Sequence, residues 1–420
     1  MTDVLQAISG KEVRWFRAGS IGLLLLFLAA GAFLSFRHQA GVVFPDEKEY
    51  FELAENLREH GFLTWDGENP TASRPPGFVF WLAILGMVGL GWSGMVAVNF
   101  AILAIGIWVL SGVWFRPERK WAGRFAVLLL LFCYPVTIYV CSTLYPQAFC
   151  FFLISVSLAL LLRSAEGRWR AVVAGVLMGW CTLTAPMYLT WVGILALVPI
   201  LRFRTGGVLH AVVFVMVAGL ATASWGIRNH QTMGKFVPFS TNSGYNLLAG
   251  NCEFTRPNAG LNIDLSQWET EVQSRGMDEI EADAYYSAEA KRWILENPGS
   301  AAAMYFQKLL NYFNFRNELI VKSAGSSLRD AVMFATYYSL LAVLVIRLVS
   351  SWPEGRTGWK EWLLVLGYLA CAMLTSVVMT RIRYRVPCDV LLFFVVAPVV
   401  YGTVRLMATK LVSRLPGRFR

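Results

Sequence analysis

Eleven apolar runs divide this chain of 420 residues, and they constrain its fold more than any other feature of the sequence. Each is roughly 14 to 22 residues long, close to the ~20 residues that an α-helix needs to cross a bilayer. Apolar residues make up 56% of the chain and charged residues only 15%, a composition that excludes an ordinary soluble domain of this length. The sequence therefore predicts an all-α polytopic membrane protein with about 10–11 transmembrane segments. The apolar runs are 18–36, 76–90, 94–115, 124–140, 147–163, 170–183, 186–201, 207–225, 328–347, 361–379 and 387–407.

The net charge of +10 would suggest a nucleic-acid partner in a soluble domain. Here the basic residues lie between apolar runs, where the positive-inside bias explains them, so no nucleic-acid partner is expected. The seven cysteines lie almost entirely inside apolar runs, and only Cys252 falls in a long loop. Their spacing matches neither a disulfide framework nor a zinc site.

Both ends of the chain are basic, which predicts that both lie in the cytoplasm. The run 18–36 lacks a convincing cleavage site, so we expect an uncleaved first span. An odd number of complete crossings cannot place both ends on one side. The basic loops after residue 115 narrow this conflict to residues 76–124, and two alternatives stay open: one short apolar segment is re-entrant, or one basic loop is external.

Two long hydrophilic segments interrupt the apolar pattern, and they hold most of the acidic residues. Residues 37–75 form the predicted first external loop, with an amphipathic helix. Residues 226–300 form a predicted second external loop, helical in structure, that caps the site. Because the chain shows no repeat and no low-complexity tract, we expect residues 1–420 to form a single integral membrane domain.

The first external loop opens with two adjacent carboxylates, Asp46 and Glu47, followed by an amphipathic pattern. Apolar or aromatic residues recur at positions 50, 53, 54 and 57, which is the spacing of one helical face. Gly61 is a typical helix stop. The pattern predicts a helix along the membrane surface that carries both carboxylates in its first turn.

The carboxylates also have a purely structural interpretation. Asp46 followed by Glu49 fits a capping box in which Asp replaces Ser or Thr, and Pro45 fixes the entry to the helix. On this interpretation Asp46 caps the helix and has no further role. The helix sequence alone leaves the two interpretations equal.

Further motifs favour a functional role. The Asp-Glu helix is followed by Thr71-Ala-Ser-Arg74-Pro-Pro-Gly77, and the combination resembles the first external loop of GT-C glycosyltransferases. The resemblance points to the polyprenyl-phosphate-sugar-dependent branch, which contains protein O-mannosyltransferases and the lipid A aminoarabinose transferase. Later elements are similar to the same branch: W-x-x-R-N at Trp225, Arg228 and Asn229, an N-P element before Lys308, and R-Y-R-x-P at Arg383, Tyr384 and Arg385.

The chain departs from this branch at two places. Tyr145-Pro146-Gln147 stands where relatives commonly have an acidic residue, and Ala185 stands where they often have the arginine of Thr-Arg-Pro. Both departures bear on the donor headgroup and on any metal. We therefore expect no protein cage for a tightly bound metal and no required cofactor, with a divalent cation as the open alternative.

The resemblance implies that Asp46 is catalytic, as the general base toward an acceptor hydroxyl, a role worth typically ~10²–10⁴-fold in rate. Glu47 is the second predicted catalytic residue and lies on a different face of the helix. Three roles stay open for it: it orients Asp46, binds a divalent cation, or favours the positive helix N-terminus.

The donor phosphate requires cations. Arg381, Arg383 and Arg385 lie between the last two apolar runs, at the predicted outer face and against the positive-inside bias. A bound anion explains them, because guanidinium groups bind phosphate oxygens bidentately. Lipid-headgroup binding or snorkelling is the alternative. Arg74, Arg228 and Lys308 are further predicted phosphate ligands, although Arg228 could instead cap a helix and Lys308 could snorkel.

Taken together, the resemblance implies an inverting membrane glycosyltransferase with a GT-C-type bundle, which transfers a sugar from a polyprenyl-phosphate-linked donor to a lipid, glycan or protein acceptor. The implied location is a bacterial inner (cytoplasmic) membrane, with membrane lipids around the bundle and the active site facing the periplasm or cell exterior. The alternative is a noncatalytic polytopic membrane subunit, or a transporter of lipid-linked glycans, with a GT-C-like fold. A transporter would need polar residues along a crossing path, whereas these charges gather at one face.

Overall fold

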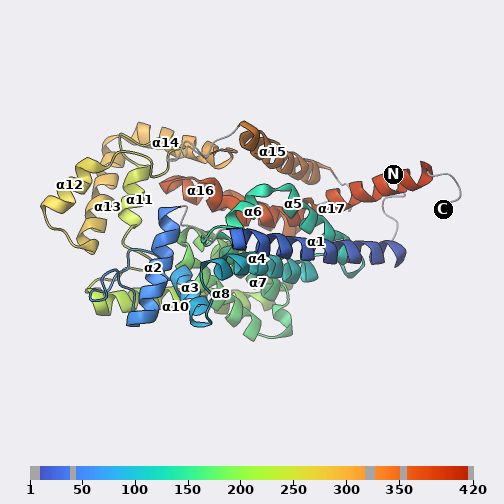
Figure 1. The fold of residues 1–420 in the computed structure, drawn as a ribbon, viewed down its shortest axis with the longest axis horizontal. Coiled ribbons are helices and arrows are strands. Elements are labelled where there is room, and N and C mark those ends of the chain that lie inside the picture. Colours follow the sequence, from blue (N-terminus) through green and yellow to red (C-terminus); the bar gives the residue numbers. More distant parts are fainter. Residues whose placement is uncertain (1–9, 38–43, 317–326, 351–356, 415–420) are drawn as a thin grey trace.

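The computed structural model describes residues 10–37, 44–316, 327–350 and 357–414, which form helices joined by turns and loops (Figure 1). Within these residues the only β-pairing is an isolated bridge between Thr64 and Pro70. The elements in chain order are α1 Gly10–Arg37, α2 Pro45–His60, α3 Pro76–Met87, α4 Trp92–Trp114, η2 Pro117–Arg119, α5 Lys120–Cys133, α6 Pro135–Cys141, α7 Gln147–Leu161, η3 Ser164–Glu166, α8 Trp169–Thr184, η4 Pro186–Tyr188, α9 Leu189–Phe203, α10 Thr205–Met233, α11 Ser243–Gly250, α12 Ser266–Ser274, α13 Glu279–Glu296, α14 Pro298–Tyr312, α15 Ser327–Val349, α16 Trp359–Val378 and α17 Ile382–Arg414.

Apart from at most three residues at its end, every predicted apolar run lies in a helix or in two consecutive helices. By length and composition, seven of the described helices can cross a membrane: α1, α4, α9 with its preceding turn, α10, α15, α16 and α17. The pair α5 and α6 adds an eighth span if it is counted as one, and it bends by 79° before Pro135, whose ring breaks a continuous helix. α3, α7 and α8 are apolar but shorter. The chain is therefore an all-α, multi-pass membrane protein, as the sequence predicts.

The two ends of the bundle differ (Figure 1). α1 begins and α17 ends at the same end, where Arg405 Nε donates to Glu12 Oε1 at 2.7 Å. At the opposite end α2 runs across the bundle axis, and α11, α12 and α13 form a cap. We call this opposite end the cap end. The hydrophilic helices thus gather away from the start of α1 and the end of α17.

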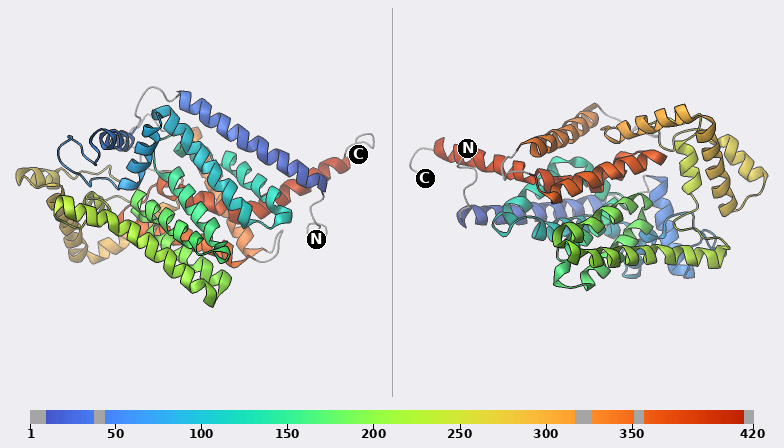
Figure 2. Two further views of the ribbon diagram at one scale, coloured as in Figure 1. Left: turned by 90° about the horizontal axis from the view of Figure 1, so that it is seen from below. Right: turned by 180° about the vertical axis from the view of Figure 1, so that it is seen from behind.

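The path from α1 to α4 shows which short apolar segment does not cross the bundle. Near the start of α1, Arg17 lies over the ring of Trp121, which contacts Trp108 late in α4. Near the end of α1, Gly31 lies against Phe100 in the first half of α4. The two helices, which lie side by side in Figure 2, are therefore antiparallel, and the chain between them begins and ends at the cap end.

α3 lies on this connecting path, so it does not cross the bundle. Its 12 residues span only about 18 Å, well short of a bilayer core. Of the two alternatives left by the sequence, the structure adopts the first, a short segment that returns to its own side. Leaving out α3 reduces the eleven predicted apolar runs to ten, an even number, as two ends on one side require.

The cap is attached to the bundle and to the first hydrophilic segment. Its apolar core joins Leu248 and Trp268 to Met379, which follows α16. Glu279, at the start of α13, accepts a hydrogen bond from Thr71 Oγ1 at 2.6 Å and one from the Ala72 backbone nitrogen at 2.9 Å. The two hydrophilic segments therefore contact each other, while their position on the outer face of a membrane stays a prediction.

We predict that Gly77→Ala destabilises the contact between α3 and α8. An added Cβ would clash with Thr184 Oγ1 and would lie 2.6 Å from the Thr184 backbone nitrogen. Because backbone cannot move aside as a flexible side chain does, such overpacking typically costs ~1–3 kcal/mol. Thermal unfolding in detergent measures the loss. Gly22→Ala on α1, where nothing lies within 4 Å of the added atom, is the control, and equal melting temperatures for the two variants would contradict the prediction.

Candidate functional site

The helix that carries the two carboxylates, α2, forms as the sequence predicts. It begins at Pro45 and ends at Gly61, whose φ of 80° is left-handed. The N-cap residue is Phe44, which makes no side-chain cap hydrogen bond, so the capping-box interpretation of Asp46 is wrong. Asp46 lies inside the first turn, where its carboxylate reaches two other segments of the chain. The buried face of α2 holds Glu47, Tyr50, Leu53 and Ala54.

Asp46 is held by two arginines from distant parts of the sequence. Arg74 Nη2 donates to Asp46 Oδ1 at 3.1 Å, and Arg383 Nη2 donates to Asp46 Oδ2 at 2.7 Å. Arg74 also donates through Nε to Glu49 Oε2 at 2.7 Å. The Asp46 side chain is 21% exposed and that of Arg383 is 29% exposed, so a ligand from outside can reach the group. Three of the predicted site residues therefore meet at one accessible point.

The surroundings of Asp46 favour its ionised form. Burial raises the pKa of this carboxyl, but the charges of Arg383 and Arg74 and their hydrogen bonds outweigh burial and lower the pKa below the ordinary value of 3.8. Burial raises the pKa of the neighbouring Tyr50 to about 12. At neutral pH the site therefore combines a carboxylate that can accept a proton with a neutral phenol.

Tyr145 covers another side of Arg383. The guanidinium carbon lies 4.3 Å from the centroid of the Tyr145 ring, within the range of a cation–π contact. The turn that carries this ring is fixed by Glu47, whose Oε1 accepts a hydrogen bond from the Leu144 backbone nitrogen at 2.7 Å. The Glu47 contact thus holds the turn between α6 and α7. We call Asp46, Glu49, Arg74, Tyr145 and Arg383 the Asp46 cluster.

Arg385 does not face this cluster. α17 begins at Ile382, so the two residues from Arg383 to Arg385 rotate the side chain by about 200°. Arg385 is 1% exposed, and its Nη1 donates to the Tyr312 backbone oxygen at 2.6 Å. The structure therefore does not bring Arg383 and Arg385 together at one phosphate, because a helix turns them to opposite sides.

Arg381 and Arg228 hold backbone oxygens of the hydrophilic segments. Arg381 Nη2 donates to Ala259 O at 2.6 Å, in the loop between α11 and α12. Arg228 Nη1 donates to Thr71 O at 3.4 Å and so contacts the segment that leads to Arg74. Through these contacts both arginines join loops to the bundle. This structural role does not require a bound phosphate.

Lys308 is likewise satisfied by protein oxygens. It is 1% exposed, and its Nζ donates to Gly250 O at 2.8 Å and to Val378 O at 3.0 Å. Burial lowers its pKa to about 8. The ammonium thereby joins α11 to the end of α16, so the structure favours an anchoring role over the snorkelling that the sequence left open.

Glu49 and Tyr145 belong to the Asp46 cluster although neither is a predicted site residue. Glu49 lies one turn after Asp46, and this helical spacing alone could have indicated it. Tyr145 stands where the resemblance leads one to expect an acid. Its contact with Arg383 depends on how α6, α7 and α17 come together, which no spacing in the sequence encodes.

No group of three or more His, Cys, Asp and Glu side chains in the described part of the chain could hold a metal ion.

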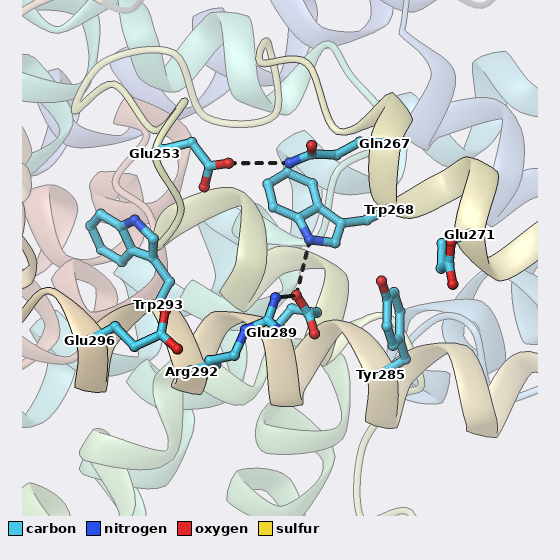
Figure 3. A pocket seen from close by; sticks show the side chains of 9 residues that line it. All are labelled: Glu253, Gln267, Trp268, Glu271, Tyr285, Glu289, Arg292, Trp293 and Glu296. Carbon is cyan, nitrogen blue, oxygen red and sulfur yellow. Dashed lines mark hydrogen bonds and ion pairs between the residues drawn. The ribbon is translucent and has the colours of Figure 1, made fainter.

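A cavity of about 380 Å³ lies in the cap, between α12 and α13 (Figure 3). Trp268 and Glu289 line it and are joined by a hydrogen bond of 3.3 Å from the indole nitrogen to the carboxylate. None of the predicted site residues lines this cavity, so the Asp46 cluster is the candidate functional site.

Comparison with known proteins gives two solved structures that are similar to this chain. The first is the archaeal oligosaccharyltransferase AglB from Archaeoglobus fulgidus in complex with an inhibitory peptide and a dolichol-phosphate, with 14% identity and a TM-score of 0.46 over 93% of this chain; the match covers 51% of AglB, so the chain spans about half of its length. The second is ArnT from Cupriavidus metallidurans bound to undecaprenyl phosphate, with 14% identity and a TM-score of 0.39 over 94% of this chain and 81% of ArnT. No family model and no curated protein matches the chain.

We predict that the ion pairs of Asp46 stabilise the fold at neutral pH and lose this effect only in acid. Because the pKa of Asp46 in the folded protein lies below 3.8, the unfolded chain takes up the proton first as the pH falls. The stabilisation is therefore complete above about pH 5 and disappears as the pH falls through the folded-state value. The difference in melting temperature between wild type and Asp46→Asn should stay constant from about pH 7 to about pH 5 and shrink below that.

The control for this measurement is Glu52→Gln on the same helix, which removes an exposed ion pair with Lys48. Exposed pairs of this kind contribute little, so this variant should differ little from wild type at any pH. An Asp46 difference that already shrinks between about pH 7 and about pH 5 would show that the arginines do not lower its pKa.

Proposed function

We propose that this protein is a membrane glycosyltransferase that transfers a sugar from a polyprenyl-phosphate-linked donor to an acceptor hydroxyl. The observation that carries the proposal is the meeting of three motif segments at one point. The Asp-Glu start of α2, the Arg-Pro-Pro-Gly segment and the R-Y-R-x-P segment contribute Asp46, Arg74 and Arg383. Asp46 and Arg383 are 337 positions apart, so closeness in the sequence does not explain their contact.

Asp46 supplies the base in this proposal. The phosphate of the donor is a good leaving group, so the acceptor hydroxyl is the group that needs activation. An ionised carboxylate within hydrogen-bond distance of that hydroxyl can take its proton, typically worth ~10²–10⁴-fold in rate. Attack on the anomeric carbon from the side opposite the phosphate would invert its configuration.

Arg74 and Arg383 supply the positive charge for the donor phosphate. Guanidinium groups offer planar pairs of N–H donors that match phosphate oxygens. Both groups now bind Asp46, and both side chains are partly exposed, so an incoming phosphate can compete with the carboxylate for their donors. We infer that donor binding draws hydrogen bonds away from Asp46 and leaves an oxygen of the carboxylate available to the acceptor hydroxyl.

The proposed setting is a bacterial inner membrane with the cap end facing the periplasm or cell exterior. A lipid, a glycan or a protein side chain can present the acceptor hydroxyl there. The proposal needs no metal ion for the phosphate, because two guanidinium groups already face the carboxylate that would otherwise bind a cation.

We predict that Asp46→Asn lowers transfer by at least ~100-fold, because an amide oxygen is a far weaker base than a carboxylate. Turnover of a radiolabelled polyprenyl-phosphate sugar in membranes measures it, at matched protein level. Glu52→Gln, on the exposed side of the same helix, should keep wild-type turnover. Equal turnover in wild type and Asp46→Asn would remove Asp46 from the role of base. A wild type that binds the donor and never turns it over would favour the noncatalytic alternative.

Arg383→Lys should insert normally and lose most of its transfer activity. Lysine keeps the positive charge but lacks the planar fork that binds two phosphate oxygens. Loss of one preorganised donor at a developing charge is worth ~2.7–4 kcal/mol in other sites, or ~10²–10³-fold in kcat. Arg381→Lys is the matched control two residues away, because Arg381 binds a backbone oxygen of the cap. Similar loss in both variants would point to general destabilisation of this segment and not to phosphate binding.

A further inference from the structure

A buried pair of opposite charges lies in α17, one turn beyond the Asp46 cluster. Arg385 is 1% exposed and Asp389 is fully buried, and residues 385–398 of this apolar helix are buried throughout. A charge inside a membrane-spanning helix is unfavourable unless it is paired, and such residues are usually functional. The proposed reaction uses neither residue directly, so their presence needs another explanation.

Arg385 joins α17 to the end of α14. Its Nη1 donates to Tyr312 O at 2.6 Å and to Asn314 O at 2.5 Å. These carbonyl oxygens lie at and just after the end of α14, where backbone oxygens have no partner inside the helix. Its Nε donates to Asp389 Oδ2 at 3.2 Å, and its guanidinium carbon lies 3.6 Å from the centroid of the Tyr337 ring. The side chain is therefore fixed from several directions.

Asp389 lies on the same face of α17 as Arg385 and continues the connection to another segment. Its Oδ2 accepts a hydrogen bond of 2.7 Å from the hydroxyl of Tyr134. Tyr134 is the residue between α5 and α6, where this pair of helices bends by 79°. A continuous polar chain thus runs from the end of α14, through Arg385 and Asp389, to the bend between α5 and α6.

This chain of contacts bears on the position of Arg383 in two ways. Because Arg385 faces the core, the helical twist directs Arg383 to the other side of α17, toward Asp46. The bend at Tyr134 sets the direction of α6, and the turn after α6 carries Tyr145, whose ring lies against Arg383. The rotation of α17 and the position of the Tyr145 turn therefore depend on the same buried contacts.

We propose that Arg385 and Asp389 are positioning residues that fix the rotation of α17, so that Arg383 reaches Asp46 and Tyr145. For its effect on turnover the proposal rests on the proposed glycosyltransferase function. Its structural part, the control of the Asp46–Arg383 ion pair, does not. The two parts are tested separately.

The first test measures the ion pair without activity. Thermal unfolding of wild type, Asp46→Asn, Arg383→Lys and the double variant gives the coupling between residues 46 and 383. The same four measurements are then repeated in a background with Arg385→Met and Asp389→Leu, which removes both buried charges together and so leaves none unpaired. We expect coupling in wild type and its loss in this neutral background. Unchanged coupling would overturn the proposal.

The second test measures turnover of a polyprenyl-phosphate sugar. Asp389→Asn should lower kcat by about 100-fold, the size of effect that a displacement of ~1 Å can produce. Adding Arg383→Lys should then cost much less than it does in wild type, because Arg383 is already displaced. Additive losses, or recovery of kcat in the neutral background, would show that the pair serves only stability. An inactive wild type would contradict the proposed function and leave the first test unaffected.

The control is a second buried ion pair at the other end of the bundle. Arg347 Nη2 donates to Glu361 Oε1 at 2.8 Å, and the Arg347 side chain is 2% exposed. Glu361→Gln breaks this pair and should lower the melting temperature as Asp389→Asn does, yet leave kcat unchanged. An equal fall in kcat would mean that any loss of a buried ion pair impairs this enzyme, and the proposal would fail.

Discussion

The cap end of this molecule depends on one carboxylate placed between two guanidinium groups. The Asp46 side chain is mostly buried, where an unpaired charge would be strongly unfavourable. Its contacts with Arg74 and Arg383 compensate that charge and, at the same time, hold α2, the loop after it and the start of α17 together. The interaction that stabilises this end of the fold is therefore also the one that keeps the Asp46 carboxylate ionised.

The helices could be predicted because apolar runs of bilayer length have few other structures available. The run 76–90 shows the limit of that argument. Its composition is the same whether it crosses a membrane or returns, and the decision depends on the direction of α4 relative to α1. The contact of Gly31 with Phe100 carries that information, and such a long-range contact has no local signal in the sequence.

The candidate site was predictable to a similar degree. Asp46, Arg74 and Arg383 could be named from motifs, and the structure brings them together. Arg385 could not be separated from Arg383 by sequence, because the apolar run begins at residue 387 whereas the helix begins at Ile382. Without the helix start, alternate arginines look equivalent. Once it is known, the 3.6-residue period assigns one to the surface and the other to the core.

The distance along the chain between Asp46 and Arg383 has a consequence for biogenesis. A chain is synthesised from its N-terminus, so α1 and α2 are made long before Arg383, which follows Asp46 by 337 positions. Until α17 leaves the ribosome, the Asp46 carboxylate has Arg74 as a partner but lacks the second arginine. A chain that stops before α17 would retain most of its apolar helices and still expose an undercompensated acid. The Asp46–Arg383 pair therefore forms only after the start of α17 has been synthesised, so this contact reports that α17 has reached its place beside α2.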